Sequence, residues 1–97
     1  MFAIAFDMVI ADLEQFYGVP YHHAYYEIKG IMQQHQFHWI QGSTYITSSD
    51  DLSVVFDAIN ALSDVDWFAL SVRDIRAFKV DNWSDFTASV KRKINKI

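Results

Sequence analysis

The sequence predicts an α+β fold, in which helices cover one face of an antiparallel β-sheet. Three observations predict it. Residues 2–8 alternate with the period of a strand, two later stretches repeat apolar residues at helical spacing, and residues 72–80 are rich in β-branched and aromatic side chains. The chain has 97 residues, a length that fits one domain over residues 1–97.

The first predicted strand, residues 2–8, is apolar on both faces. Its bulky side chains alternate with two alanines and then Asp7. One face therefore carries large side chains, and the other carries small ones followed by an acid. A strand that is apolar on both faces is typical of the centre of a sheet. The small face implies that something approaches it closely.

A helical segment and a hairpin follow this strand. Residues 10–17 predict one or two helical turns, which end at the Gly-Val-Pro sequence of residues 18–20 because a residue before proline is biased away from the helix. Apolar and aromatic residues at helical spacing over residues 21–35 predict a long helix. Two short β-rich runs, residues 37–41 and 43–47, predict a hairpin or a bulged, bent strand.

The second half begins with a second helix. The polar residues 48–51 supply capping side chains, and residues 52–62 carry apolar side chains at helical spacing. Residues 64–70 are expected to be irregular and to lead into the strand at residues 72–80.

A last helix is expected to begin at Ser84. Its apolar residues Phe86, Val90 and Ile94 recur at a spacing of four, a narrow stripe that predicts packing on the body as an appendage. The order is therefore β-α-β-β-α-β plus one C-terminal helix, the ferredoxin-like arrangement, in which helices lie on one face of the sheet.

The other face of this sheet needs a cover. A chain of this size that left it bare would expose a large apolar patch, which usually marks an interface. We expect a homodimer packed sheet to sheet, whose two-fold symmetry brings the two copies of Asp7 toward one cleft.

Charge is distributed unevenly along the chain. Residues 1–72 carry nine acids and a single base, Lys29, whereas residues 73–97 carry seven bases and three acids, so a local charge of −8 + 4 gives the net −4. A basic segment of this kind has two interpretations: a surface for polyanions, or cations that complement the C-terminal end of the last helix, from Lys91 to Lys96.

Composition excludes several classes of function. The chain has no cysteine, so it forms no disulfide, thiolate metal site or cysteine nucleophile, which fits a reducing compartment such as the cytoplasm. Its first residues lack the basic start of a signal peptide, and no stretch is long and apolar enough to predict a membrane span. The four histidines show no zinc pattern, and the absence of a phosphate-binding glycine loop disfavours cofactor enzymes.

Asp7 is the first candidate for chemistry, because it lies near the end of a central strand. One interpretation is a catalytic or metal-binding carboxylate; the other is an ion pair with Arg73 or Arg76. If dimer symmetry places two Asp7 carboxylates together, repulsion raises one pKa or recruits a divalent cation such as Mg²⁺ between them.

The basic residues of the last strand are the candidate phosphate contacts. Arg73, Arg76 and Lys79 share one run, and arginine binds phosphate through two parallel hydrogen bonds. On a regular strand Asp74 shares its face with Arg76 while Arg73 points away, so only Arg76 joins Asp74 unless a bulge intervenes. The alternative for both arginines is pairing with nearby acids.

Ser43 and Thr44 follow Gly42 in the predicted hairpin. Such a loop brings backbone N–H groups and a hydroxyl against a phosphate. The alternative is a capped turn, a role that Ser and Thr favour.

Four segments, together with a short one near the C-terminus, carry a family resemblance. They are MFAIAFD at residues 1–7, YGVPY at 17–21, WIQGSTY at 39–45, SVRDIRAFKV at 71–80 and SDF at 84–86. They resemble bacterial virulence-associated protein D over nearly the whole chain, and the sequence diverges more after Phe86.

The resemblance implies a ferredoxin-like homodimer, related in fold to the small CRISPR adaptation nuclease, that acts as an endoribonuclease on RNA. Members are often the toxin of a toxin–antitoxin pair, so a small antitoxin protein is an expected partner. By position, Asp7 resembles the catalytic carboxylate of the family, and Ser43 and Asp74 fall in motifs of the same site. The rival hypothesis is a non-catalytic dimer that binds RNA or protein through its basic C-terminal third, with Asp7 only tying the sheet together.

Overall fold

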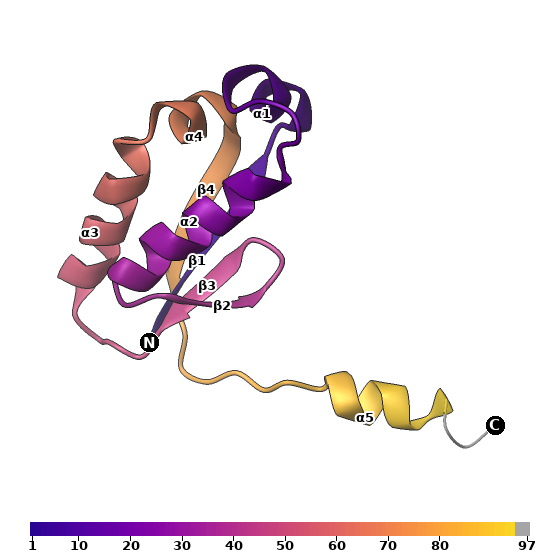
Figure 1. The fold of residues 1–97 in the computed structure, drawn as a ribbon. Coiled ribbons are helices and arrows are strands. Elements are labelled where there is room, and N and C mark those ends of the chain that lie inside the picture. The colour runs from indigo at the N-terminus through magenta and orange to yellow at the C-terminus, as the bar shows by residue number, and fades with distance from the viewer. Residues whose placement is uncertain (95–97) are drawn as a thin grey trace.

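The computed structural model describes residues 1–94, which form a four-stranded antiparallel sheet with helices on one side (Figure 1). The strands are β1 (Phe2–Met8), β2 (His38–Gln41), β3 (Thr44–Thr47) and β4 (Val72–Lys79), in the spatial order β2-β3-β1-β4. This order and the antiparallel pairing confirm the predicted ferredoxin-like arrangement. They place β1 in the centre, between β3 and β4.

Within residues 1–94, five helices connect and follow the strands. They are α1 (Ile10–Phe16), α2 (His22–Gln34), α3 (Leu52–Ser63), α4 (Asp66–Ser71) and α5 (Thr87–Arg92). The two long ones, α2 and α3, lie side by side over the same face of the sheet (Figure 1). Both are amphipathic: α2 buries Ala24, Ile28 and Met32 at a spacing of four residues.

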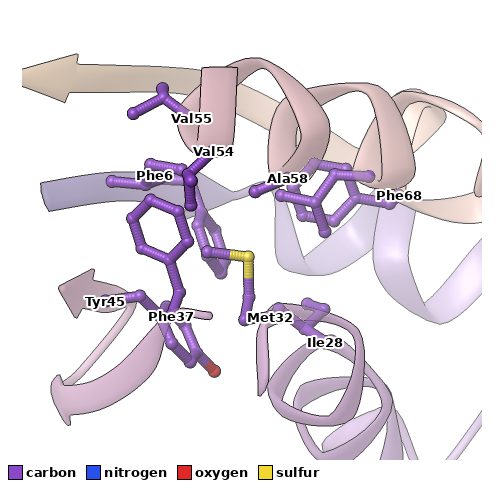
Figure 2. Close-up of a cluster of buried hydrophobic side chains, with 11 residues drawn as sticks. Phe6, Ile28, Met32, Phe37, Tyr45, Val54, Val55, Ala58 and Phe68 are labelled. Atoms are coloured by element: carbon purple, nitrogen blue, oxygen red, sulfur yellow. The ribbon is translucent and has the colours of Figure 1, made fainter. Parts of the chain in front are cut away.

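The core fills the space between these two helices and the sheet. Phe6 from β1 lies at its middle, stacked on the ring of Tyr45 with centroids 6.2 Å apart and edge-to-face with Phe68 at 5.4 Å. Met32 and Phe37, both essentially inaccessible to solvent, close the layer from the side of α2 (Figure 2). The bulky face of β1 is therefore the one that the helices cover, as the sequence predicts.

The caps explain where α3 begins. Asp51 has an extended backbone, and its carboxylate accepts a hydrogen bond of 2.9 Å from the backbone N–H of Ser53. That contact lowers the pKa of Asp51, because the carboxylate is the form that the N–H groups stabilise.

Two expectations about helices are wrong. Residues 66–71 form α4 instead of an irregular stretch, because Phe68 is buried in the core and Trp67 packs edge-to-face on Tyr17 with centroids 4.8 Å apart. Tertiary contacts of this kind stabilise a helix too short for its periodicity to be recognised.

The C-terminal arm, residues 81–94, also differs from the prediction. Helix α5 begins at Thr87, three residues later than Ser84, where the Asp85 carboxylate accepts a hydrogen bond from the Thr87 N–H. It does not pack on the body: the arm extends away from the sheet (Figure 1), and Phe86, Val90 and Ile94 are 66–69% exposed. A stripe only three residues wide gives this helix too little apolar surface to hold it against the chain's own body. Lys91 and Arg92 lie in its last turn, and Lys96 lies outside the described residues.

Within residues 1–94, no helix has the length and apolarity needed to cross a membrane.

Candidate functional site

The open face of the sheet is the one that the helices leave uncovered. Strand registers place three pairs on it across β1 and β4: Ala3 opposite Phe78, Ala5 opposite Arg76, and Asp7 opposite Asp74. From β3, Thr44 and Ile46 join the same face. On β1 the side chains of this face are therefore small until the charged Asp7 near the end of the strand, and the larger ones come from β3 and β4.

Two carboxylates and two arginines meet at that end. Arg73 donates from Nη2 to Oδ2 of Asp7 at 2.8 Å and from Nε to Oδ2 of Asp74 at 3.3 Å. Arg76 Nη1 lies 3.2 Å from Oδ1 of Asp74. Arg73 thus bridges two acids from neighbouring strands, and the Asp74 carboxylate forms ion pairs with both arginines.

A bulge makes this arrangement possible. The register of β1 against β4 shifts between Asp7, which pairs with Asp74, and Met8, which pairs with Val72. Arg73 is the additional residue, so its side chain is freed from strict alternation and reaches the acids. A regular strand would leave only Arg76 beside Asp74. The bulge brings Arg73 to Asp74 as well, so both arginines contact this carboxylate.

The cluster is open to solvent. The side chains of Asp7, Arg73 and Arg76 are 62–74% exposed, and Asp74 is 34% exposed. Surface ion pairs of this kind contribute little to folding stability. The pKa of Arg73 is raised, first by its hydrogen bond to Asp74 and then by the charge of Asp7, so the guanidinium stays protonated.

The β2–β3 hairpin forms the opposite wall. Its turn, Gly42-Ser43, is held to β1 by a 3.1 Å hydrogen bond from the Phe6 N–H to the Ser43 carbonyl. Gly42 has a φ of +49°, a conformation that disfavours residues with a Cβ. Ser43 is thereby placed across from Asp7.

These walls enclose a cavity of about 450 Å³, which we call the carboxylate–arginine cavity. It is lined by Ala5, Phe6, Asp7, Gly42, Ser43, Thr44, Asp74, Arg76 and Phe78. All three residues that the sequence analysis singled out as catalytic, Asp7, Ser43 and Asp74, line it. Thr44, which follows Ser43 in the sequence, lines it too. Phe78 was missed, and only strand register identifies it.

Lys79 is not brought to this cavity. It pairs with Phe2, five residues along β1 from Asp7, which corresponds to roughly 17 Å of strand. Its charge instead acts on Asp50, whose carboxylate binds the N-terminal amino group and has a lowered pKa for that reason. A role for Lys79 in RNA binding stays a prediction.

Two carboxylates, those of Asp7 and Asp74, are the candidate ligands for a metal ion at this site. Within residues 1–94, no three side chains of His, Cys, Asp or Glu gather as a metal site. Asp7 and Asp74 alone supply fewer oxygen ligands than Mg²⁺ or Ca²⁺ takes, so a bound cation would need water, substrate or a second chain to complete its shell.

Comparison with known proteins identifies the family. The endoribonuclease VapD of Dichelobacter nodosus is 55% identical over 91 residues, which cover 94% of this chain and 98% of that protein. The endoribonuclease VapD of Helicobacter pylori is 48% identical over 93 residues, 94% of this chain and 99% of that protein. The chain belongs to the VapD family. No protein-family model matches it. A second relative at 55% identity, endoribonuclease VapD 1 of Riemerella anatipestifer, covers 89% of this chain, so the VapD resemblance seen in the sequence is confirmed.

Proposed function

We propose that this chain is an endoribonuclease that cleaves RNA phosphodiester bonds in the carboxylate–arginine cavity. The observation that carries the proposal is the placement of Asp7, Asp74 and Arg76 on an open cavity of about 450 Å³, with Arg73 bound to both acids beside it. The VapD relatives, which bear the name endoribonuclease, support it.

The arginines supply the phosphate contacts. Both are exposed and charged, and both are held by Asp74, so a phosphate entering the cavity meets guanidinium groups that are already oriented. Charge develops on the phosphoryl oxygens in the transition state, and arginine donors near those oxygens stabilise it.

Asp7 is the proposed general base. Its contact with Arg73 uses Oδ2, and within residues 1–94 no hydrogen bond engages Oδ1. In one route, this oxygen accepts the proton of a ribose 2′-hydroxyl, whose oxygen attacks phosphorus while the bond to the 5′-oxygen breaks and that oxygen takes up a proton from water. This route leaves a cyclic phosphate, and it cleaves only RNA.

The second route uses water as the nucleophile. A divalent cation bound to Asp7 would lower the pKa of that water. In that case Asp7 would hold the cation and Arg73 and Arg76 would bind the phosphate. Attack of the water on phosphorus would break one P–O ester bond, the leaving oxygen would take up a proton from solvent, and a chelator would remove the activity.

We further propose that the chain works as a cytoplasmic homodimer, packed through the open face. Ala3 and Ala5 give this face a flat centre, and Phe78, 48% exposed, lies on it. Size-exclusion chromatography with light scattering should give twice the 11.3 kDa of one chain, and Ala5→Arg should convert the dimer to a monomer. A toxin role with a small antitoxin partner is proposed on the family resemblance alone.

A non-catalytic binding module is the second candidate. The observation that favours it is the 2.8 Å ion pair between Asp7 and Arg73, which satisfies the carboxylate within the chain. In this case Asp7 fixes the ends of β1 and β4, and the arginines only hold RNA.

Cleavage of a labelled structured RNA by the wild type and by Asp7→Asn, with and without chelator, tests the proposal. We expect cleavage to fall by about a hundredfold or more in Asp7→Asn, while Asp57→Asn, an exposed acid on α3, cleaves normally. Chelator sensitivity and the chemical nature of the product ends decide between the two routes. Equal cleavage by both proteins, or none by either, would contradict the nuclease.

A further inference from the structure

A second cavity lies between α2 and the β2–β3 hairpin. Its volume is about 290 Å³, and it is lined by Tyr25, Tyr26, Lys29, Trp39, Gly42 and Tyr45. Four of these six residues are aromatic and one is a cation. We call it the aromatic cavity.

Its aromatic side chains are more exposed than folding requires. Tyr26 is 72% exposed and Trp39 is 50% exposed, whereas Tyr45 at the cavity floor is buried in the core. The indole of Trp39 on β2 and the phenol of Tyr26 on α2 present flat faces to a ligand from the two walls, at little cost in conformational entropy. Flat rings of this kind stack on nucleobases, whatever the base.

Lys29 adds a positive charge at the same place. It is the single base among residues 1–72, and its ammonium group lies 5.7 Å from the centre of the Trp39 ring. Within residues 1–94, it forms no ion pair with an acid. The Lys29 ammonium group at this aromatic wall can bind the phosphate of a nucleotide whose nucleobase stacks on the rings.

The aromatic cavity adjoins the proposed site of cleavage. Gly42 lines both cavities, and its carbonyl accepts a 2.8 Å hydrogen bond from Nε1 of Trp39, which fixes the indole against the turn. From the other side, the negative charge of Asp7 contributes to the raised pKa of Tyr25, after burial and the neighbouring Tyr21. One strand of RNA can therefore occupy both cavities by passing the Gly42 turn.

We propose that the aromatic cavity binds one unpaired nucleobase of the RNA substrate, stacked on Trp39 or Tyr26, with Lys29 on an adjacent phosphate. Its volume lies at the lower end of that of small-ligand sites, which suits a single base. The proposal rests on the proposed function, because the neighbouring phosphate is the one positioned for cleavage.

Titration of the Asp7→Asn protein with short, fluorescein-labelled single-stranded oligoadenylate and oligouridylate tests the proposal without cleavage. Adding Tyr26→Leu or Lys29→Gln should weaken binding by about tenfold, as expected for loss of one stacked base or one phosphate contact. Phe56→Leu removes a ring from α3 that is also mostly exposed, at 61%, and lies outside both cavities, so it should change affinity by less than about twofold. Lys29→Arg keeps the charge and should restore binding.

Unchanged affinity in both Tyr26→Leu and Lys29→Gln would overturn the proposal, including the case in which the cavity holds a peptide or a second copy of the chain. The cleavage assay is read separately. If the variants bind more weakly but the wild type does not cleave RNA, the base-binding proposal is supported and the nuclease proposal is contradicted. If the wild type cleaves RNA but the variants bind normally, the nuclease proposal is supported and the base-binding proposal is contradicted.

Discussion

The seven residues of β1 point alternately to two faces of the sheet, and the two faces serve opposite purposes. On the covered face, Ile4 and Phe6 are nearly inaccessible and meet the helices; on the open face, Ala3 and Ala5 are small and Asp7 is exposed. Since side chains alternate along a strand, one sequence fixes both faces at once. The comparison teaches that the covered face supplies stability, while the open face leaves room for chemistry.

The energetic contrast follows from burial. Apolar side chains on the covered face lose their water and contribute to folding. The ion pairs at the end of the open face remain in solvent and contribute little. Charges that are not needed for stability are available for a ligand.

The largest predicted effect is on the covered side. Phe37→Ala should lower the free energy of unfolding by about 3–5 kcal/mol, because a fully buried ring leaves a cavity in the core (Figure 2). In the monomeric Ala5→Arg background, Phe78→Ala on the open face should lower it by about 1 kcal/mol or less, since that ring is half exposed in a single chain. Urea unfolding of both variants measures the difference. Equal losses would contradict the assignment of the two faces.

The next prediction concerns the bulge. Arg73→Gln should slow RNA cleavage by about a hundredfold, because it removes both the phosphate contact and the group that orients Asp7. Its melting temperature should stay within about 4 °C of the wild type. Arg92→Gln on α5 is the matched control and should cleave normally. A large loss of stability in Arg73→Gln would favour the purely structural role of the ion pair.

The smallest prediction concerns the cap of α3, which lies far from the open face. Asp51→Ala should lower the melting temperature by about 4–8 °C at neutral pH, with cleavage at low temperature unchanged. Because folding lowers the pKa of Asp51, its contribution is complete above pH of about 4 and is lost as the pH falls through the folded value. The difference from wild type should therefore shrink in acid.

Asp51→Asn keeps a neutral acceptor for the Ser53 N–H, so it should recover part of the stability that Asp51→Ala loses at neutral pH, and its own stability should not follow the titration of residue 51. A constant difference between Asp51→Ala and wild type across this pH range would mean that the carboxylate charge does not act on the cap.

Most of the fold follows from patterns that the sequence shows directly. The period-two alternation of β1, the helical spacing in α2 and α3 and the run at β4 predict the sheet and its helices. The misses have physical causes: α4 depends on Phe68 reaching a distant core, and α5 remains exposed because its narrow apolar stripe, which includes Phe86 and Val90, buries too little surface.

The site was predictable in its residue types but not in its geometry. Asp7, Ser43 and Asp74 stand out in the sequence and line one cavity. The bulge that brings in Arg73 depends on strand register, which no local pattern reveals. One feature of the sequence points to the aromatic cavity, the isolated basic residue Lys29. That Trp39 on β2 lies beside it follows only from the fold.

The most direct test compares Asp7→Asn with Ile4→Val, three residues apart on β1 and on opposite faces, by melting temperature and by RNA cleavage at a low temperature. The account predicts that Ile4→Val melts about 4–8 °C lower and cleaves normally, since loss of a buried methyl group costs about 1 kcal/mol. Asp7→Asn should keep its melting temperature within about 4 °C and lose cleavage. An Asp7→Asn protein that unfolds early, or one that cleaves at the wild-type rate, would contradict the division between the two faces.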